Sequence, residues 1–212
     1  MKRLFTLLFV AAIVLSVAGC AAPGAGTGAS DKIVIGLEAP LTGDYAYEGK
    51  GMEKAIKLLI EQTNAAGGIN GKQVELIVED DKGDPKEASL VADRMVSNKV
   101  AAVIGAYNSS ATEPASVTYN RANILHITPS STRVSLTEKG FKQFFRVCFL
   151  DDRQGLFAAK FMKEVLGNKN IAILHDNSTY AQGLAEETKK YAEQEGLNIV
   201  LFDAINPKDQ DF

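Results

Sequence analysis

The sequence has no tryptophan, two cysteines and two histidines among its 212 residues. Two cysteines exclude a fold held together by a framework of several disulfides. Lysine plus arginine (23) and aspartate plus glutamate (26) nearly balance, giving a formal net charge of −3, and neither end carries a basic or acidic tail. This balance argues against a nucleic-acid partner. Apolar residues make up 46% of the chain, enough for one large hydrophobic core or two small ones.

The first 19 residues have the pattern of a targeting segment, so they are left out of the fold prediction. Lys2 and Arg3 supply a positive start, and residues 4–19 carry no charge. This run is shorter than the roughly 20 residues that a membrane-spanning helix needs. It ends in Val17-Ala18-Gly19-Cys20, and small residues before a cysteine resemble the lipobox of bacterial lipoproteins, whose thiol receives a diacylglycerol.

We therefore expect residues 1–19 to be a lipoprotein signal peptide and Cys20 to be the lipidation site. The alternative is a plain secretory signal beside an incidental cysteine. Residues 20–30, rich in alanine and glycine, predict a flexible tether. The domain would then be extracytoplasmic and lipid-anchored to the membrane, in the periplasm or at the outer face of the cell membrane. Cys148 would have no intrachain partner, and its apolar neighbours favour a small buried residue.

From Asp31 onward, short apolar runs alternate with amphipathic segments. The runs are rich in β-branched residues and bounded by turn residues, which predicts buried strands. These strands are expected at residues 32–37, 73–79, 100–104, 124–127, 170–175 and 198–202. Helical spacing predicts helices between them, one of which starts with Asp84 as N-cap, Pro85 in the first turn and Glu87 closing a capping box. Another helix is expected to begin between Ser110 and Pro114. Strands that alternate with helices predict an α/β fold of parallel sheets with helices on both faces.

A boundary near residues 148–152 divides this pattern into two lobes. Residues 31–149 hold four strands and are expected to form an N-terminal ligand-binding lobe. Residues 150–212 begin a new strand–helix–strand series with two clear strands. Two strands cannot bury both faces of a parallel sheet, so we expect this second lobe to be incomplete.

Polar loops follow several of the predicted strands, and ligands of open α/β sheets bind beyond the carboxyl ends of the strands. The loops after the third and fourth strands, residues 105–112 and 128–132, are dense in hydroxyls, and the first of them opens a helix. Hydroxyls and free backbone N–H groups at a helix start favour an anion. Neither loop contains lysine or arginine, so a carboxylate suits the site better than a phosphate. A zwitterionic amino acid would fit, although serine and threonine are also ordinary loop and cap residues.

Several short motifs, in this order, resemble the leucine/isoleucine/valine-binding family of ABC-transporter periplasmic proteins, from about Asp31 to Phe212. The motifs are Pro40-Leu41-Thr42-Gly43, residues 64–71, Asp80-Asp81 with Asp84-Pro85, Ile104-Gly105 with Ser109-Ser110, Pro129 with Thr132, Phe145-Arg146, and His175-Asp176 with Tyr180. The resemblance implies a type I periplasmic-binding-protein fold of two Rossmann-like lobes, the second truncated. It also implies that the protein captures a branched-chain or related amino acid and delivers it to ABC-transporter permease subunits.

The resemblance also implies individual roles. Ser109 is expected to bind the ligand carboxylate through its hydroxyl and amide, with Tyr107 and Asn108 beside it. Ser130 would present its carbonyl to the ligand ammonium, Thr132 would contact both ends, and Tyr180 would close over the ligand from the second lobe.

This sequence departs from the family at three points. The family often has tyrosine directly before the glycine at position 49, whereas this chain has Tyr47-Glu48-Gly49, so either Tyr47 or Glu48 could face the cleft. A disulfide that some members form at the positions of Gly83 and Asn108 is impossible here. The family's acidic partner of the ammonium falls beyond Phe212, so this chain alone is expected to bind weakly or not at all.

Other functions fit less well. An enzyme is disfavoured because Ser109-Ser110 lacks the Gly-x-Ser-x-Gly elbow, and His126 and His175 end apolar strands, where histidine is usually packed and hydrogen-bonded. Asp80, Asp81 and Asp84 lack the downstream glutamate of a calcium loop and favour a turn and a helix cap. No cofactor or metal is expected. A ligand-binding sensor or receptor domain of the same fold stays open, as does a binding protein for amides, urea or aromatic acids.

Overall fold

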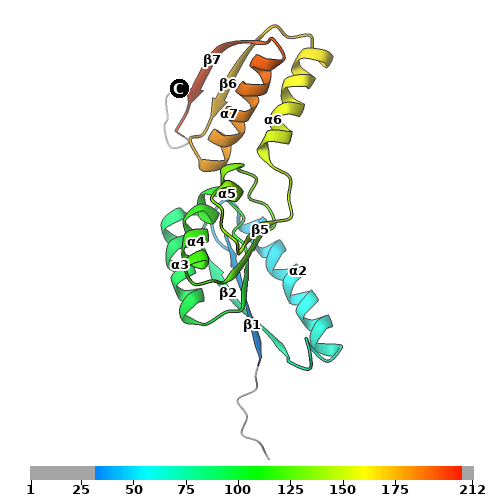
Figure 1. The fold of residues 1–212 in the computed structure, drawn as a ribbon, viewed down its shortest axis with the longest axis vertical. Helices are drawn as coiled ribbons and strands as arrows, with labels where there is room; N and C mark the ends of the chain where they lie inside the picture. The colour runs from blue at the N-terminus through cyan, green and yellow to red at the C-terminus, as the bar shows by residue number, and fades with distance from the viewer. Residues whose placement is uncertain (1–31, 207–212) are drawn as a thin grey trace, which may run out of the picture. The chain divides into compact units, whose positions relative to one another are not determined.

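Five parallel strands form the larger sheet of the computed structural model, which describes residues 32–206. Their order across the sheet is β2-β1-β3-β4-β5 (Figure 1). The strands are β1 (Ile33–Ala39), β2 (Val74–Asp80), β3 (Ala102–Ile104), β4 (Leu125–Thr128) and β5 (Phe144–Arg146). Because all are parallel, their carboxyl ends and the loops that follow lie along one edge of the sheet. The signal-peptide, tether and Cys20 predictions lie outside the described residues.

Helices cover both faces of this sheet, as predicted. α2 (Ala46–Ala65) packs on one face, where Ile56 and Leu37 are buried together. α3 (Pro85–Ser97) and α4 (Ser109–Arg121) pack on the other face (Figure 1), around Met95, Val103 and Tyr119. The repeated crossover from strand to helix to parallel strand explains this three-layer arrangement.

The fifth strand was not predicted. β5 pairs in parallel with β4, with Phe144 opposite His126, and completes the sheet after a short helix, α5 (Ser135–Glu138). It has three residues, and no clear helical period precedes it, so its apolar run did not stand out as part of the sheet. Cys148, just beyond it, is half-buried rather than buried, and its Sγ lies 3.5 Å from the Ser131 carbonyl.

A second, two-stranded parallel sheet contains β6 (Asn170–His175) and β7 (Asn198–Ala204). α6 (Asp151–Lys160), continued by a π-helical turn η1 (Phe161–Val165), packs against α7 (Thr179–Gln194). Ala159 of α6, Ala185 of α7 and Ile173 of β6 are buried in one hydrophobic cluster between the helices and one face of this sheet. Leu174 and Val200 are exposed, so within residues 32–206 the predicted cover on both faces is found only for the larger sheet.

Several local features of the chain can be compared with the sequence directly. Asn70 and Gly71 have φ values of 52° and 77°, a conformation typical of a turn. Asp84 caps α3, accepting hydrogen bonds from the N–H groups of Lys86 and Glu87 at 2.8 and 3.0 Å. The capping box is wrong: the Asp84 N–H donates to the Asp81 carbonyl, and the Glu87 carboxylate pairs with a lysine instead. α4 begins at Ser109, earlier than the predicted 110–114.

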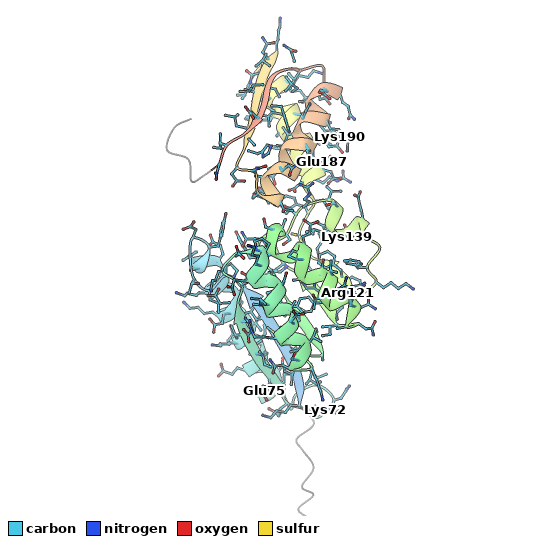
Figure 2. All side chains as sticks on the ribbon, turned by 90° about the vertical axis from the view of Figure 1, so that its left-hand side faces the viewer. Lys72, Glu75, Arg121, Lys139, Glu187 and Lys190 are labelled. Atoms are coloured by element: carbon cyan, nitrogen blue, oxygen red, sulfur yellow. The ribbon has the colours of Figure 1, made fainter. Side chains whose placement is uncertain are left out.

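Contacts join residues from Lys32 onward into one compact unit, so the predicted boundary near residue 149 stays a prediction. The outer helix surfaces carry charged residues, such as Lys190, whose Nζ lies 2.9 Å from Glu187 Oε2 on α7 (Figure 2). Among the described residues, no helix is both long and apolar enough to cross a membrane.

Candidate functional site

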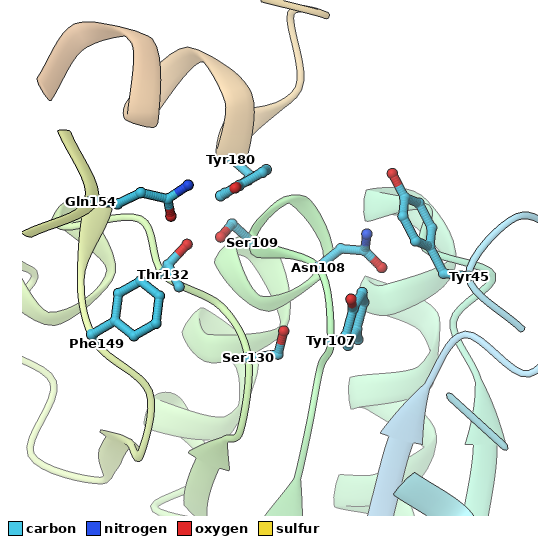
Figure 3. A pocket seen from close by; sticks show the side chains of 9 residues that line it. All are labelled: Tyr45, Tyr107, Asn108, Ser109, Ser130, Thr132, Phe149, Gln154 and Tyr180. Carbon is cyan, nitrogen blue, oxygen red and sulfur yellow. The ribbon is translucent and has the colours of Figure 1, made fainter. Parts of the chain in front are cut away.

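A cavity of about 280 Å³ lies beyond the carboxyl ends of the strands, where the loops after β1, β3 and β4 approach the start of α7 (Figure 3). Its lining residues are Tyr45, Tyr107, Asn108, Ser109, Ser130, Thr132, Phe149, Gln154 and Tyr180. They come from six places in the sequence and are hydroxyl, amide and aromatic side chains. The volume is near the lower end of the roughly 300–1,000 Å³ of small-molecule pockets, so the cavity suits a small ligand.

The first turn of α4 supplies one wall. Asn108 is the N-cap residue in extended conformation, but its side chain makes no capping hydrogen bond, and Ser109 opens the helix. The first N–H groups of a helix have no partner within the helix and carry the positive end of its dipole. Ser109 is only 2% exposed, and its Oγ lies 3.4 Å from the Arg133 amide nitrogen. The turn therefore offers a neutral site that favours negative charge.

The loop between β4 and α5 supplies a second wall, and hydrogen bonds fix its shape. The Thr128 hydroxyl donates to the Ala106 carbonyl at 2.8 Å and accepts from the Ser131 amide at 3.1 Å. The Ser131 side chain turns away from the cavity and lies 2.7 Å from the Thr112 hydroxyl. Ser130 and Thr132, on either side of it, line the cavity (Figure 3). Ser131 therefore stabilises the shape of the loop, while Ser130 and Thr132 are available to a ligand.

Aromatic rings supply the remaining walls. Tyr45 and Tyr107 lie with ring centroids 5.9 Å apart, and Phe149 and Tyr180 approach from the segments before α6 and at the start of α7. Burial, followed by the nearby Asp176 carboxylate, raises the pKa of Tyr45. Tyr180 follows Thr179, the first residue of α7, whose start is capped by the Ser178 hydroxyl. These rings provide apolar surface around a polar base.

Among residues 32–206, no lysine, arginine, aspartate or glutamate lines the cavity. Two buried titratable residues, Glu38 and His126, are not among the lining residues. Burial raises the pKa of Glu38, which accepts a hydrogen bond from Tyr119. Burial lowers the pKa of His126 to about 4, and its Nε2 lies 2.7 Å from the Gly105 carbonyl. The expectation that His126 is packed and hydrogen-bonded is confirmed. Asp80 and Asp81 accept backbone hydrogen bonds in the turn, as predicted.

The structure brings six of the eight predicted ligand-binding residues to this one cavity: Tyr107, Asn108, Ser109, Ser130, Thr132 and Tyr180. Tyr47 and Glu48 are not among the lining residues, and Tyr47 is 88% exposed. A Cβ at Gly49 would overlap the Pro40 carbonyl, so Gly49 faces the loop after β1. Residues two apart on a helix point about 200° apart, which turns Tyr47 outward.

Sequence reasoning did not find Tyr45, Phe149 and Gln154. Tyr45 is the N-cap residue of α2, in the loop after β1, which the strand-end rule had already marked. Its place in a loop that follows a strand is the sequence feature that could have identified it. Phe149 lies just before α6 and Gln154 in its first turn, and no sequence pattern pointed to them.

The family disulfide that this chain lacks corresponds to two neighbouring positions. A Cβ placed on Gly83 would lie 3.2 Å from Asn108 Oδ1 and 3.7 Å from its Cγ. Asn108 Oδ1 is buried and has no hydrogen-bond partner among the described residues. The loop after β2 therefore supports the α4 start by packing alone.

A fold of parallel strands whose loops surround a small neutral cavity defines a class of solute-binding protein, and the comparisons agree. The chain belongs to the periplasmic binding protein family, which matches residues 32–212. The resemblance to the branched-chain amino acid branch of that family is also confirmed. The chain is 42% identical over 184 residues to the leucine-, isoleucine-, valine-, threonine- and alanine-binding protein of Pseudomonas aeruginosa, covering 87% of this chain and 49% of that one.

An amino acid binding protein of the same organism is 40% identical over the whole of this chain and 55% of its own length. The chain thus spans about half the length of the curated relatives it matches.

Solved structures show the same fold. The branched-chain amino acid transporter substrate-binding protein LivJ of Streptococcus pneumoniae, in complex with isoleucine, has a TM-score of 0.76 and 34% identity. The match covers 85% of this chain and 51% of that one. The leucine-binding protein LivK of Thermotoga maritima has a TM-score of 0.78 and 27% identity, with the same coverage of 85% and 51%. The predicted type I periplasmic-binding-protein fold is confirmed.

Proposed function

We propose that this chain is part of the extracytoplasmic solute-binding component of an ABC importer, and that its cavity holds a branched-chain or related amino acid. One observation carries the proposal. Neutral donors from the α4 start and from the β4–α5 loop line the same cavity, and none of its lining residues in the described part of the chain is charged. Neutral donors suit a zwitterion, because its carboxylate is already balanced by the positive charge of its own ammonium group. The relatives named above, which are binding proteins for amino acids, support the same ligand class.

The proposed binding mode assigns each wall a part of the ligand. The Ser109 hydroxyl and amide hold the carboxylate, where the positive end of the α4 dipole adds to two hydrogen bonds. The Ser130 carbonyl accepts from the ammonium, and Thr132 reaches both groups. The aliphatic side chain then packs against the aromatic walls, where burying a leucine-sized group contributes roughly 1.5–3 kcal/mol.

Delivery to a permease requires that the loaded protein differ from the empty one. Tyr180 belongs to α7, which connects the two strands of the second sheet, whereas Ser109 and Thr132 follow strands of the first sheet. A ligand that contacts both groups of residues favours the conformation in which they are close together. We propose that this conformation is the one that docks to the permease subunits.

Lipid attachment at Cys20 is part of the same proposal, supported by the Val17-Ala18-Gly19-Cys20 motif. It would hold the protein at the membrane surface beside its permease. Labelled fatty acid should be incorporated into the wild-type protein and into C148S, but not into C20S. Equal labelling of C20S would show that Cys20 is not the lipidation site, and absence of label from the wild type would leave a secreted protein without a lipid anchor.

The ligand is tested by isothermal titration calorimetry of the full-length mature protein against all proteinogenic amino acids. Saturable heat with leucine, isoleucine or valine, lost in S109A, supports the proposal. The same titration with amides, urea and benzoate tests the alternative ligand classes. Heat from one of these, with silence across the amino acids, would replace the ligand and keep the fold. Silence from every compound would overturn the binding function of the cavity.

A further inference from the structure

Arg133 joins the cavity loop to α7. It directly follows Thr132 in the loop between β4 and α5, yet its guanidinium reaches the other sheet's helix. Nη1 donates to the Thr179 carbonyl at 2.8 Å, and Nη2 lies 3.3 Å from Glu186 Oε2. Nε donates to the Ser135 hydroxyl at 3.3 Å, so all three guanidinium nitrogens have partners. A side chain with three fixed partners is held in one orientation, because the planar guanidinium directs its donors in set directions.

The two ends of this contact are each one residue from the cavity. Thr132 and Tyr180 both line it, and they precede Arg133 and follow Thr179 in the chain. The side chain of Arg133 is one-fifth exposed, so its hydrogen bonds are partly shielded from water. Charge-assisted hydrogen bonds in that setting are stronger than exposed surface pairs.

Gly183 makes room for the guanidinium. It lies within α7, where glycine is less favourable than alanine, so its presence calls for a local reason. A Cβ at position 183 would lie 3.0 Å from Arg133 Nη1 and 3.1 Å from its Cδ. These contacts are tighter than normal, and Arg133 would have to move by a few tenths of an ångström. Glycine at position 183 therefore leaves the space that the Arg133 side chain occupies.

The loop end of the contact is itself fixed. Arg146 on β5 donates from Nη1 to the Ser131 and Arg133 carbonyls at 3.0 and 2.8 Å, and from Nη2 to the Val134 carbonyl at 3.1 Å. These bonds hold the backbone on both sides of Thr132. A rigid base allows Arg133 to transmit the position of the loop to α7.

We propose that Arg133 is a positioning residue for ligand binding: it holds the start of α7 so that Tyr180 faces the cavity, and Gly183 is required for that contact. The inference rests on the proposed amino-acid binding function. Arg133 itself is not among the residues that line the cavity. Its effect on affinity therefore has to pass through Tyr180.

A double-mutant cycle in the full-length mature protein tests this, with leucine affinity and dissociation rate as readouts. R133A is expected to weaken binding about 10-fold, mostly through faster dissociation. In the Y180A background the same substitution is expected to change affinity less than about 2-fold, since coupled residues are non-additive. Equal factors in both backgrounds would overturn the inference. R133K, which keeps the charge but not the fork of donors, should recover only part of the affinity.

Two further variants separate positioning from general destabilisation. R94A removes a comparable pair, in which Arg94 Nη2 lies 2.8 Å from Glu79 Oε2 within the first sheet and its helices, and it should leave leucine affinity unchanged. G183A should weaken binding without lowering the urea midpoint of unfolding, because alanine favours the helix. Its effect should vanish in the R133A background.

Persistence of the G183A effect in that background would contradict the inference, as would loss of affinity in R94A. Wild-type protein that binds no amino acid would overturn the proposed function and this inference together. Wild-type binding with additive effects would overturn the inference alone.

Discussion

The Tyr119 hydroxyl donates a 2.6 Å hydrogen bond to Glu38 Oε2, joining two fully buried residues that lie 81 positions apart. Glu38 is the next-to-last residue of β1, close to the loop that leads to Tyr45, and Tyr119 lies on α4, whose first turn carries Ser109. Glu38 Oε1 is buried with no hydrogen-bond partner among the described residues. Burial is the main reason that the pKa of Glu38 is well above 4.5, so the folded protein favours the protonated carboxyl.

E38Q should reveal this proton in the pH dependence of stability. A carboxyl whose folded pKa is raised binds its proton more tightly when folded, so its contribution falls as pH rises from 4.5 to the folded pKa. Each pH unit in that window costs at most about 1.4 kcal/mol. E38Q removes the ionisation, and urea unfolding from pH 4.5 to 8 should show the variant gaining stability relative to wild type. Parallel curves would show that Glu38 has an ordinary pKa.

Y119F tests the other partner of this pair. Its hydrogen bond lowers the pKa of Glu38, because it stabilises the ionised carboxylate more than the neutral acid. Removing the hydroxyl should cost about 1–2 kcal/mol of unfolding free energy. The cost should grow at the alkaline end of the range, where Glu38 ionises. A cost independent of pH, measured by the same urea titrations, would argue against an ionisable partner.

His126 should make the protein sensitive to acid. Burial lowers its pKa from 6.5 to about 4, so folding excludes a proton that the unfolded chain accepts. Stability is then complete above pH 6.5 and falls as pH decreases toward 4, by about 3 kcal/mol over the window. H126Q keeps an N–H that can donate to the Gly105 carbonyl but cannot be protonated there. The difference in unfolding free energy between the two proteins should shrink or reverse as the pH falls from 7 to 4; a constant difference would contradict the assignment.

Tyr45 and Tyr47 form a natural matched pair for testing the cavity. Tyr45 lines it, and Tyr47, two residues later, is 88% exposed. Y45A removes aromatic surface from the proposed ligand's side chain and should weaken leucine binding about 10-fold, consistent with the loss of 1–2 kcal/mol of apolar contact. Y47A should stay within about 2-fold of wild type. Titration calorimetry with the full-length mature protein measures both, and the opposite ranking would place the ligand elsewhere.

Features that depend on residues close together in the sequence were predictable, whereas features that depend on distant residues were not. The strands were predictable because a parallel strand covered by helices is a continuous apolar run, and Asp84-Pro85 marked a helix start by its own chemistry. Glu87 shows the limit of that reasoning, since Lys82 competes successfully for its carboxylate. The three-residue strand β5 was missed because it is too short to stand out as an apolar run, and only its pairing with β4, 18 positions earlier in the chain, identifies it as a strand.

The same distinction applies to the residues at the cavity. The strand-end rule and the chemistry of hydroxyls indicated the loops that contain Ser109, Ser130 and Thr132, and the family resemblance selected these three residues within them. Tyr47 was chosen by its neighbour Gly49, but the direction of a side chain at a helix start depends on where the helix begins. In the structure α2 begins at Ala46, and its Gly49 packs closely against the Pro40 carbonyl. Arg133 and Gly183 are 50 positions apart, and no local pattern connects them.

The cap at Asp84 gives a prediction about stability that is independent of the cavity. Asp84 Oδ1 accepts from two backbone N–H groups of α3, and D84A should cost about 1 kcal/mol of unfolding free energy while leaving leucine affinity unchanged. D84N should lose only a few tenths, because asparagine is an equally good N-cap. The Glu87 N–H lowers the pKa of Asp84, so the ionised side chain adds stability above pH 3.8, and this part is lost as pH falls through the lowered value. The difference between D84N and wild type should therefore narrow at acid pH, and chemical unfolding at pH 7 and pH 3 measures it. A D84N cost equal to that of D84A at neutral pH would mean that the charge, and not the hydrogen bonds, stabilises the helix.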